Sequence, residues 1–116
     1  MDEGVSQELP MSKYHSKITR VGDKKFHSKK EADRFVELTL MEKAQAIQDL
    51  KTQVAFPLIK KSAYGKEIKY VADFVYYEDG VMVVEDVKSP ITKKNQVYVL
   101  KKRLMAELYG ITLRET

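Results

Sequence analysis

Residues 70–88 contain two apolar runs joined by the dipeptide Asp79-Gly80, and this segment constrains the fold more than any other. Asp-Gly between β-rich runs is the strongest short-range signal for a β-hairpin, because both turn residues must adopt a positive φ. With a two-residue loop, counting outward from the turn places Asp73 directly opposite Asp86. Like charges that face each other across a ladder destabilise a sheet. The pattern therefore predicts a functional reason for the pair.

The register also decides which other side chains join the two carboxylates. Side chains alternate across a strand, so Asp86 and Lys88 share one face and Glu85 points to the other. A three-residue loop would place Asp73 opposite Glu85, and the sequence does not exclude it. We prefer the two-residue loop because it groups Asp73, Asp86 and Lys88. Such a group predicts a site for a divalent cation, and strand-end polar residues in solvent are the alternative.

The composition narrows the class of protein and the kind of metal. The chain has 116 residues, 43% hydrophobic and 33% charged, which fits one globular domain. Its N-terminus is acidic and polar, unlike a signal peptide, and no apolar run approaches the ~18–20 residues that cross a bilayer. We expect no membrane partner and a cytoplasmic, intracellular location. With no cysteine and two histidines, any metal should be a hard cation bound through oxygen.

The chain organisation predicts an α/β fold, with a mixed central β-sheet flanked by helices. Residues 1–13 read as a flexible N-terminal arm and residues 14–116 as a single domain. Pro57 suggests that its strand lies at the sheet edge or ends there, and apolar residues on both faces of 81–88 indicate a central strand. The expected elements are a loose hairpin at 14–26, a helix from about 29 to the mid-forties, strands at 52–59, 67–77 and 81–88, a helix at 94–109 and a short strand at 111–113.

Glu31 has two readings. Ser28 and Glu31 have the spacing of a capping box, which opens a helix for purely structural reasons. A carboxylate in the first helical turn could also reach the sheet as an additional metal ligand. The two roles are compatible, because the cap positions the start of the helix.

Three short motifs carry a resemblance to a known superfamily. Ser-x-x-Glu-Ala at 28–32, Ala-Asp-Phe at 72–74 and Glu-Asp-Val-Lys at 85–88, followed by a basic helix, resemble the PD-(D/E)XK nucleases. The order is similar to that of archaeal Holliday-junction resolvases and transposon-end endonucleases, and the nearest likeness is to small phage-type proteins of the superfamily. The resemblance covers about residues 14–113 and implies a restriction-endonuclease-like core. Ala72 replaces the nominal proline, and the doublet Glu85-Asp86 leaves two candidates for the motif's acid.

The resemblance implies a set of catalytic and metal-binding residues. Asp73 and Asp86 would bind Mg²⁺ or Mn²⁺, together with the Val87 carbonyl and Glu31. Lys88 would orient or help deprotonate the attacking water, or stabilise the transition state. Strand parity favours Asp86 as the motif's acid, and Glu85 is the alternative.

Basic residues follow the hairpin and suit a polyanionic substrate. The formal net charge is only +4, so their distribution says more than their number. Ordinary solvated helix surface is the alternative reading for each cluster. The candidate DNA-binding residues are Lys93, Lys94, Gln96, Lys101, Lys102 and Arg103.

The function predicted from these features is a magnesium-dependent endodeoxyribonuclease. We expect it to act on branched DNA or on recombination and replication intermediates, as Holliday-junction resolvases do, and to work as a homodimer encoded by a phage or prophage. The alternative is a non-catalytic nucleic-acid-binding or phage regulatory module that retains the nuclease fold. A protein-interaction domain is a third option, supported only by the modest net charge.

Overall fold

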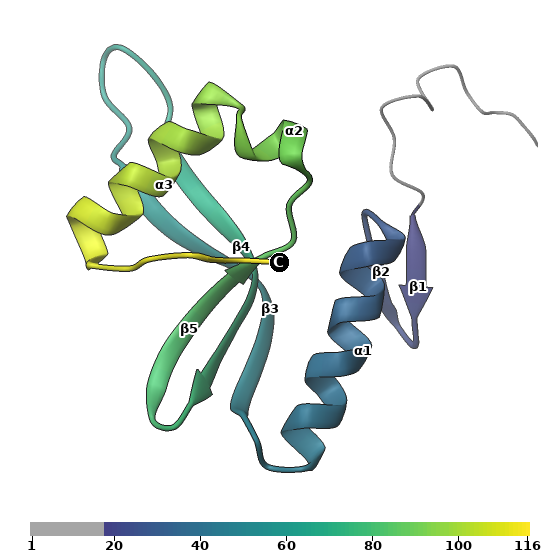
Figure 1. Cartoon of the computed structure of the whole chain (residues 1–116). Coiled ribbons are helices and arrows are strands. Elements are labelled where there is room, and N and C mark those ends of the chain that lie inside the picture. The colour runs from purple at the N-terminus through teal and green to yellow at the C-terminus, as the bar shows by residue number, and fades with distance from the viewer. Residues whose placement is uncertain (1–17) are drawn as a thin grey trace, which may run out of the picture. The chain divides into compact units, whose positions relative to one another are not determined.

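The structure is a computed structural model that describes residues 18–116. The arm predicted for residues 1–13 lies outside the described residues. The chain divides into two compact units, one ending at Glu37 and the other comprising Leu38–Thr116 (Figure 1). Helix α1 (Lys29–Lys43) begins in the first unit and continues into the second, as predicted for this segment. No helix among residues 18–116 is long and apolar enough to span a bilayer.

The first unit opens with the predicted hairpin. Strands β1 (Thr19–Val21) and β2 (Lys24–Phe26) pair antiparallel across a turn in which Gly22 has φ 59°. The ring of Phe26 packs on that of Phe35 in α1, with centroids 4.9 Å apart. These contacts fix the start of α1 against the hairpin.

The second unit is built on a four-stranded mixed sheet, which confirms the predicted α/β class. Its strands are β3 (Gln48–Ile59), β4 (Ile68–Glu78), β5 (Val81–Asp86) and β6 (Arg114–Glu115). They lie in sequence order, and β6 runs parallel to β5 while the other neighbours are antiparallel. The predictions of an edge strand at Pro57 and a central strand at 81–88 are therefore confirmed, although the central strand ends at Asp86.

The hairpin between β4 and β5 has the predicted two-residue loop. Asp79 and Gly80 both have positive φ, 53° and 77°, as the turn requires. Glu78 pairs with Val81, and the ladder continues to Phe74 opposite Glu85. The three-residue alternative is excluded by this register, and the next residues outward are Asp73 and Asp86.

The prediction of a strand at 111–113 is wrong. Gly110 ends the preceding helix with φ 67°, and the chain then crosses the core, where Leu113 is buried and Ile111 packs against the buried cluster. Pairing with β5 begins only at Arg114, opposite Glu85. The apolar residues that suggested a strand are connecting residues that fill the core.

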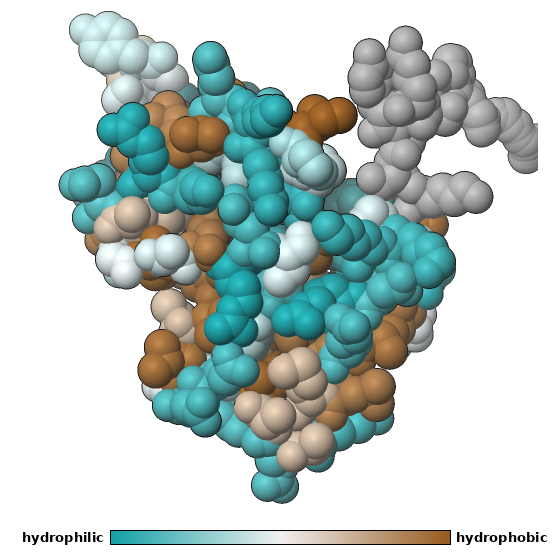
Figure 2. Space-filling model, viewed as in Figure 1, coloured by the Kyte–Doolittle hydropathy of each residue, from teal (hydrophilic) through white to brown (hydrophobic). Residues whose placement is uncertain are grey.

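The helix predicted at 94–109 is confirmed as one helix from Gln96 to Tyr109, and a short helix that was not predicted precedes it. The short α2 (Pro90–Lys93) is capped by Ser89, and α3 (Gln96–Tyr109) is capped by Asn95. The buried residues of α3 are Tyr98 and Met105. Four apolar residues lie at helical spacing along α3: Val97, Leu100, Leu104 and Leu108. Leu104 packs against the core, whereas the other three are more than half exposed. Figure 2 shows hydrophilic side chains interleaved with apolar ones over α2 and α3.

Candidate active site

The two carboxylates predicted to face each other lie where the β4–β5 ladder ends. The backbone N–H of Asp73 donates to Asp86 Oδ1 at 2.9 Å, and the N–H of Val87 donates to Asp73 Oδ2 at 2.9 Å. Each carboxylate thus takes the place of a backbone carbonyl on the opposite strand. The strands can separate here without leaving these N–H groups unpaired.

The neighbouring strand is irregular at the same level. Counting between the pairs Thr52–Phe74 and Val54–Ala72 places Gln53 opposite Asp73. Gln53 has φ 54°, which is uncommon for a residue other than glycine. Departures from regular strand geometry concentrate next to active sites. Asp49 of the same edge strand also has a positive φ, 56°, so the irregular backbone includes the level of the carboxylates but is not confined to it.

Asp86 is completely buried, and one of its oxygens is poorly satisfied. Its Oδ2 atom receives no hydrogen bond from any residue that the structure describes, and Lys88 Nζ lies 3.5 Å away. Burial raises the pKa of the Asp86 carboxyl, while the Asp73 N–H and the Lys88 charge oppose that rise. Buried polar atoms of this kind are rare and call for an explanation such as catalysis or an ion.

Lys88 is held between a carboxylate and an aromatic ring. Besides its ion pair with Asp86, its ammonium lies 4.8 Å from the centroid of the Tyr98 ring. The Lys102 ammonium lies 5.6 Å from the same centroid. Tyr98 of α3 is therefore a platform for two cations. Its side chain fixes Lys88 beside the carboxylate.

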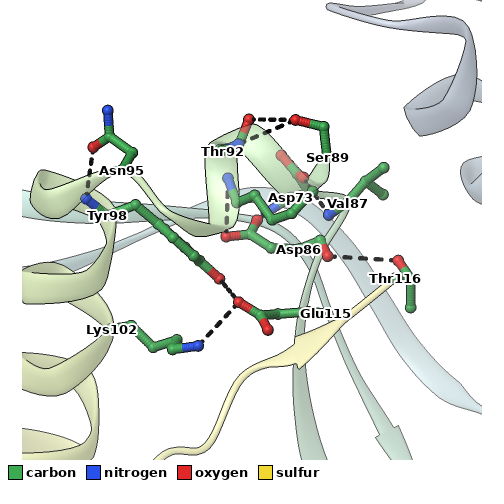
Figure 3. Close-up of polar contacts among 11 residues, drawn as sticks. Asp73, Asp86, Val87, Ser89, Thr92, Asn95, Tyr98, Lys102, Glu115 and Thr116 are labelled. Atoms are coloured by element: carbon green, nitrogen blue, oxygen red, sulfur yellow. Dashed lines mark hydrogen bonds and ion pairs between the residues drawn. The ribbon is translucent and has the colours of Figure 1, made fainter.

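Glu115 of β6 completes this arrangement. Tyr98 Oη donates a hydrogen bond to Glu115 Oε2, which Lys102 Nζ also contacts at 3.1 Å (Figure 3). The hydrogen bond from Tyr98, with help from Lys102, holds the pKa of the Glu115 carboxyl below its usual range. Burial, reinforced by Glu115, raises the pKa of Tyr98. The Glu115 charge also contributes to the raised pKa of Asp86.

Glu85, the alternative acid, points to the other face of the sheet. Its Oε1 accepts from Tyr76 Oη at 2.5 Å and its Oε2 from Thr116 Oγ1 at 3.2 Å. Arg114 then links Tyr76 to Glu78 through its Nη1, at 3.1 and 3.0 Å. Glu85 is thus part of a buried network separate from Asp73. Of the doublet, the structure brings Asp86 next to Asp73.

Glu31 lies in the other unit of the chain. Its backbone N–H donates to Ser28 Oγ at 3.0 Å, so the N-cap bond of the predicted capping box is present. Its side chain is buried within the described structure. The assignment of Glu31 as a metal ligand stays a prediction.

The predicted DNA-binding residues all lie on α2, on α3 or between them, but in different surroundings. Lys101 lines a pocket together with Lys88, and Lys102 is engaged by Glu115. The remaining four are exposed: Lys93, Lys94, Gln96 and Arg103.

Two residues next to the carboxylates, Tyr98 and Glu115, were missed by sequence reasoning. Tyr98 follows the N-cap of α3, but the more apolar stripe that includes Val97 and Leu100 masked its buried position. Glu115 lies beyond the predicted last strand. No local signal links either residue to Asp86, because the contacts depend on how α3 and β6 return to the sheet.

The residues present suit a hard cation that retains water. Within residues 18–116 no three Asp, Glu, His or Cys side chains gather as a metal-binding group. Mg²⁺, however, is usually held by one or two carboxylates, with waters and substrate phosphates completing its shell. Asp73, Asp86 with its unsatisfied oxygen and the Val87 carbonyl match that requirement.

The chain was compared with known families and structures. Residues 11–114 match the family model described as "Protein of unknown function (DUF1064)", and the chain belongs to this family. No curated protein and no solved structure is significantly similar to it.

Proposed function

We propose that this protein is a metal-dependent DNA endonuclease with the restriction-endonuclease-like core of the PD-(D/E)XK superfamily. One observation carries the proposal: a buried, under-satisfied Asp86 carboxylate lies beside Asp73, with Lys88 Nζ 3.5 Å from Asp86 Oδ2. Two carboxylates and a lysine on adjacent strands are the elements that the sequence motifs imply. Their position at the open end of a hairpin supports the same reading.

The architecture supports the proposal at a coarser level. Helix α1 precedes three antiparallel strands, and α3 then leads to a fourth strand that is parallel to the third. This is the order of helices and strands predicted from the sequence, with the two acids on successive strands, as the resemblance implies. The short helix α2 is an addition to it.

The proposed chemistry uses carboxylates, a backbone carbonyl and a lysine of the site. Asp73, Asp86 and the Val87 carbonyl would hold Mg²⁺ or Mn²⁺, with Glu31 as a further candidate ligand. A bound cation of this kind supplies an activated water and neutralises charge on the scissile phosphate. Lys88 would orient that water or donate to the phosphate as negative charge develops. Tyr98 and Asp86 restrict the Lys88 side chain to the position where it can do so.

The substrate we propose is branched DNA or a related recombination or replication intermediate. Basic side chains on α2 and α3 would supply contacts to the phosphate backbone, which position the substrate without reading its sequence. A chain of 116 residues offers little surface for a junction, so we propose a homodimer that makes two symmetric cuts. A protein that light scattering shows to be strictly monomeric on junction DNA would contradict the junction-resolving version.

The test is a cleavage assay on linear, nicked, flapped and four-way DNA with Mg²⁺, Mn²⁺ or EDTA. Asp73→Asn and Asp86→Asn are preferred to alanine variants, because asparagine retains an oxygen that accepts the cross-strand N–H. We expect both variants, and Lys88→Met, to lower the cleavage rate by roughly 10²-fold or more, while the two asparagine variants retain DNA binding.

The matched control is Asp79→Asn. It removes a carboxylate from the same hairpin at the far end and keeps a residue that favours the turn, so cleavage should stay within a few-fold of wild type. Undiminished cleavage by Asp86→Asn would overturn the site assignment.

A non-catalytic nucleic-acid-binding module is the second candidate function. It is favoured by the two cross-strand bonds, since Asp73 and Asp86 each accept a backbone N–H and so brace the sheet without any metal. This alternative predicts DNA binding that survives Asp73→Asn and no cleavage of any substrate in any metal.

A further inference from the structure

A pocket of about 310 Å³ opens beside the carboxylates, between the start of β4 and the N-terminal end of α3. Lys69 and Tyr70 line it from β4, Thr92 and Asn95 from the α2–α3 region, and Lys101 from α3. Lys88 belongs both to this pocket and to the carboxylate site. The two sites are therefore neighbours that share one cation.

The charge of the pocket selects an anion. Three lysines reach it, and none of the described residues that line it is acidic. The first turn of the 14-residue helix α3 also borders it through Val97 and Tyr98. The N-terminal end of a helix carries about half a positive charge and binds phosphate groups readily.

The polar groups of the walls are donors. Asn95 Oδ1 already accepts the Tyr98 N–H at 3.0 Å, which leaves the Asn95 amide nitrogen as a donor. Tyr70 is 3% exposed, and its hydroxyl has no hydrogen-bond partner among the described residues. The wall that Tyr70 forms therefore holds an unsatisfied polar group close to the pocket.

We infer that this pocket binds a phosphate group of the nucleic-acid strand, next to the phosphate that lies at the carboxylates. The inference rests on the proposed endonuclease function and extends it. Because Lys88 borders both sites, a phosphate in the pocket sets the register of the strand with respect to Asp86. Lys69 and Asn95 are substrate-binding residues in this arrangement, and neither was expected from the sequence.

The direct test titrates inorganic phosphate into the ¹⁵N-labelled full chain in EDTA, where no metal is bound. We expect the amide resonances of residues 69 and 95–98 to shift, and the apparent affinity to fall at least about fivefold in Lys69→Ala and in Lys101→Ala. Lys60→Ala is the control. Lys60 is also exposed but lines a different pocket with Glu67 and Tyr109. Equal phosphate affinity in all three variants would overturn the inference.

A second arm uses an oligonucleotide in EDTA as the probe and distinguishes strand phosphate from free phosphate. Each pocket variant should reduce the slope of log affinity against log salt by about 1, and Lys60→Ala by much less. Phosphate binding with an unchanged oligonucleotide slope would overturn the assignment to the strand.

The failure of this inference can be told from the failure of the proposed function. Asp86→Asn should retain phosphate binding in the pocket while losing cleavage. Lysine-dependent phosphate binding in a protein that cuts no DNA would support the pocket and contradict the nuclease. Normal DNA cleavage, together with Lys69→Ala and Lys101→Ala variants that bind phosphate as Lys60→Ala does, would support the nuclease and contradict the pocket.

Discussion

Glu85 and Asp86 are neighbours in the chain and both are completely buried, yet the two faces of the sheet satisfy them differently. Both oxygens of Glu85 accept a hydroxyl hydrogen bond, from Tyr76 and Thr116. Asp86 has one oxygen bonded to the Asp73 N–H, while the other has no hydrogen-bond partner among residues 18–116 and lies 3.5 Å from Lys88 Nζ. Both oxygens of Glu85 are therefore hydrogen-bonded, whereas one oxygen of Asp86 has no hydrogen bond from the described residues.

The difference bears on why each carboxylate is buried. A buried charged group that is fully hydrogen-bonded can be kept for stability alone. An unsatisfied buried oxygen costs about 1–3 kcal/mol, and such local costs persist at sites where they serve a ligand or a reaction. Under the proposed function, the Glu85 face is structural and the Asp86 face holds a ligand, and three experiments test this difference.

The largest expected effect is stabilisation by a divalent cation. Ca²⁺ or Mg²⁺ at about 100 times its dissociation constant should raise the free energy of unfolding of the wild type by about 2.7 kcal/mol. Asp86→Asn should show almost none of this gain, because it removes the charge of a ligand. Glu85→Gln should keep it. Thermal or urea unfolding in metal and in EDTA measures the effect, and an equal gain in Asp86→Asn would remove the distinction between the faces.

A smaller effect is expected from removing single tyrosine hydroxyls. Tyr76→Phe leaves Glu85 Oε1 buried without its hydrogen bond, so the free energy of unfolding should fall by about 1–3 kcal/mol. Tyr70→Phe removes a hydroxyl that has no described partner, and its effect should stay within about 0.5 kcal/mol. Tyr77, which is 39% exposed, provides the control Tyr77→Phe. If urea unfolding shows equal losses for Tyr70→Phe and Tyr76→Phe, the two faces do not differ as described.

The smallest effect concerns Glu115, on the Asp86 side of β6. Its lowered pKa means that its contribution to stability is present above its unfolded pKa, near 4.5, and is lost as pH falls through the folded-state pKa. Lys102→Ala should therefore cost roughly 0.5 kcal/mol at neutral pH, as for other partly exposed ion pairs, and less in acid. Lys101→Ala is the neighbouring control. Urea unfolding at neutral pH and in acid measures this loss of stability. An equal loss for Lys102→Ala under the two conditions would contradict this role for Glu115.

The hairpin and its face pattern could be predicted because they depend on local chemistry. Asp79 and Gly80 tolerate positive φ, which selects a two-residue loop, and strict alternation then separates Asp86 from Glu85. The start of α1 was likewise predictable from Ser28, whose side chain caps the first turn. These features need only a few adjacent residues.

The last strand and the buried face of α3 could not be predicted in the same way. Ile111 and Leu113 have the composition of a strand but fill the core. Tyr98 was hidden by a more apolar stripe on the same helix. In both cases packing against distant segments overrode the local preference.

By itself, the sequence determined that a hairpin turns at Asp79-Gly80 and that Asp86 shares a face with Lys88 and not with Glu85, because turn chemistry and the two-residue period of a strand are local properties. The sequence favoured the two-residue loop that sets Asp73 against Asp86, and the structure excluded the three-residue alternative. Only the tertiary structure decided that Asp86 is fully buried, that Tyr98 lies against Lys88 and is hydrogen-bonded to Glu115, and that Lys69 and Lys101 line one pocket. These contacts join residues that are far apart in the chain. They exist only once the sheet and α3 have packed together, because burial and charge proximity are properties of the assembled core.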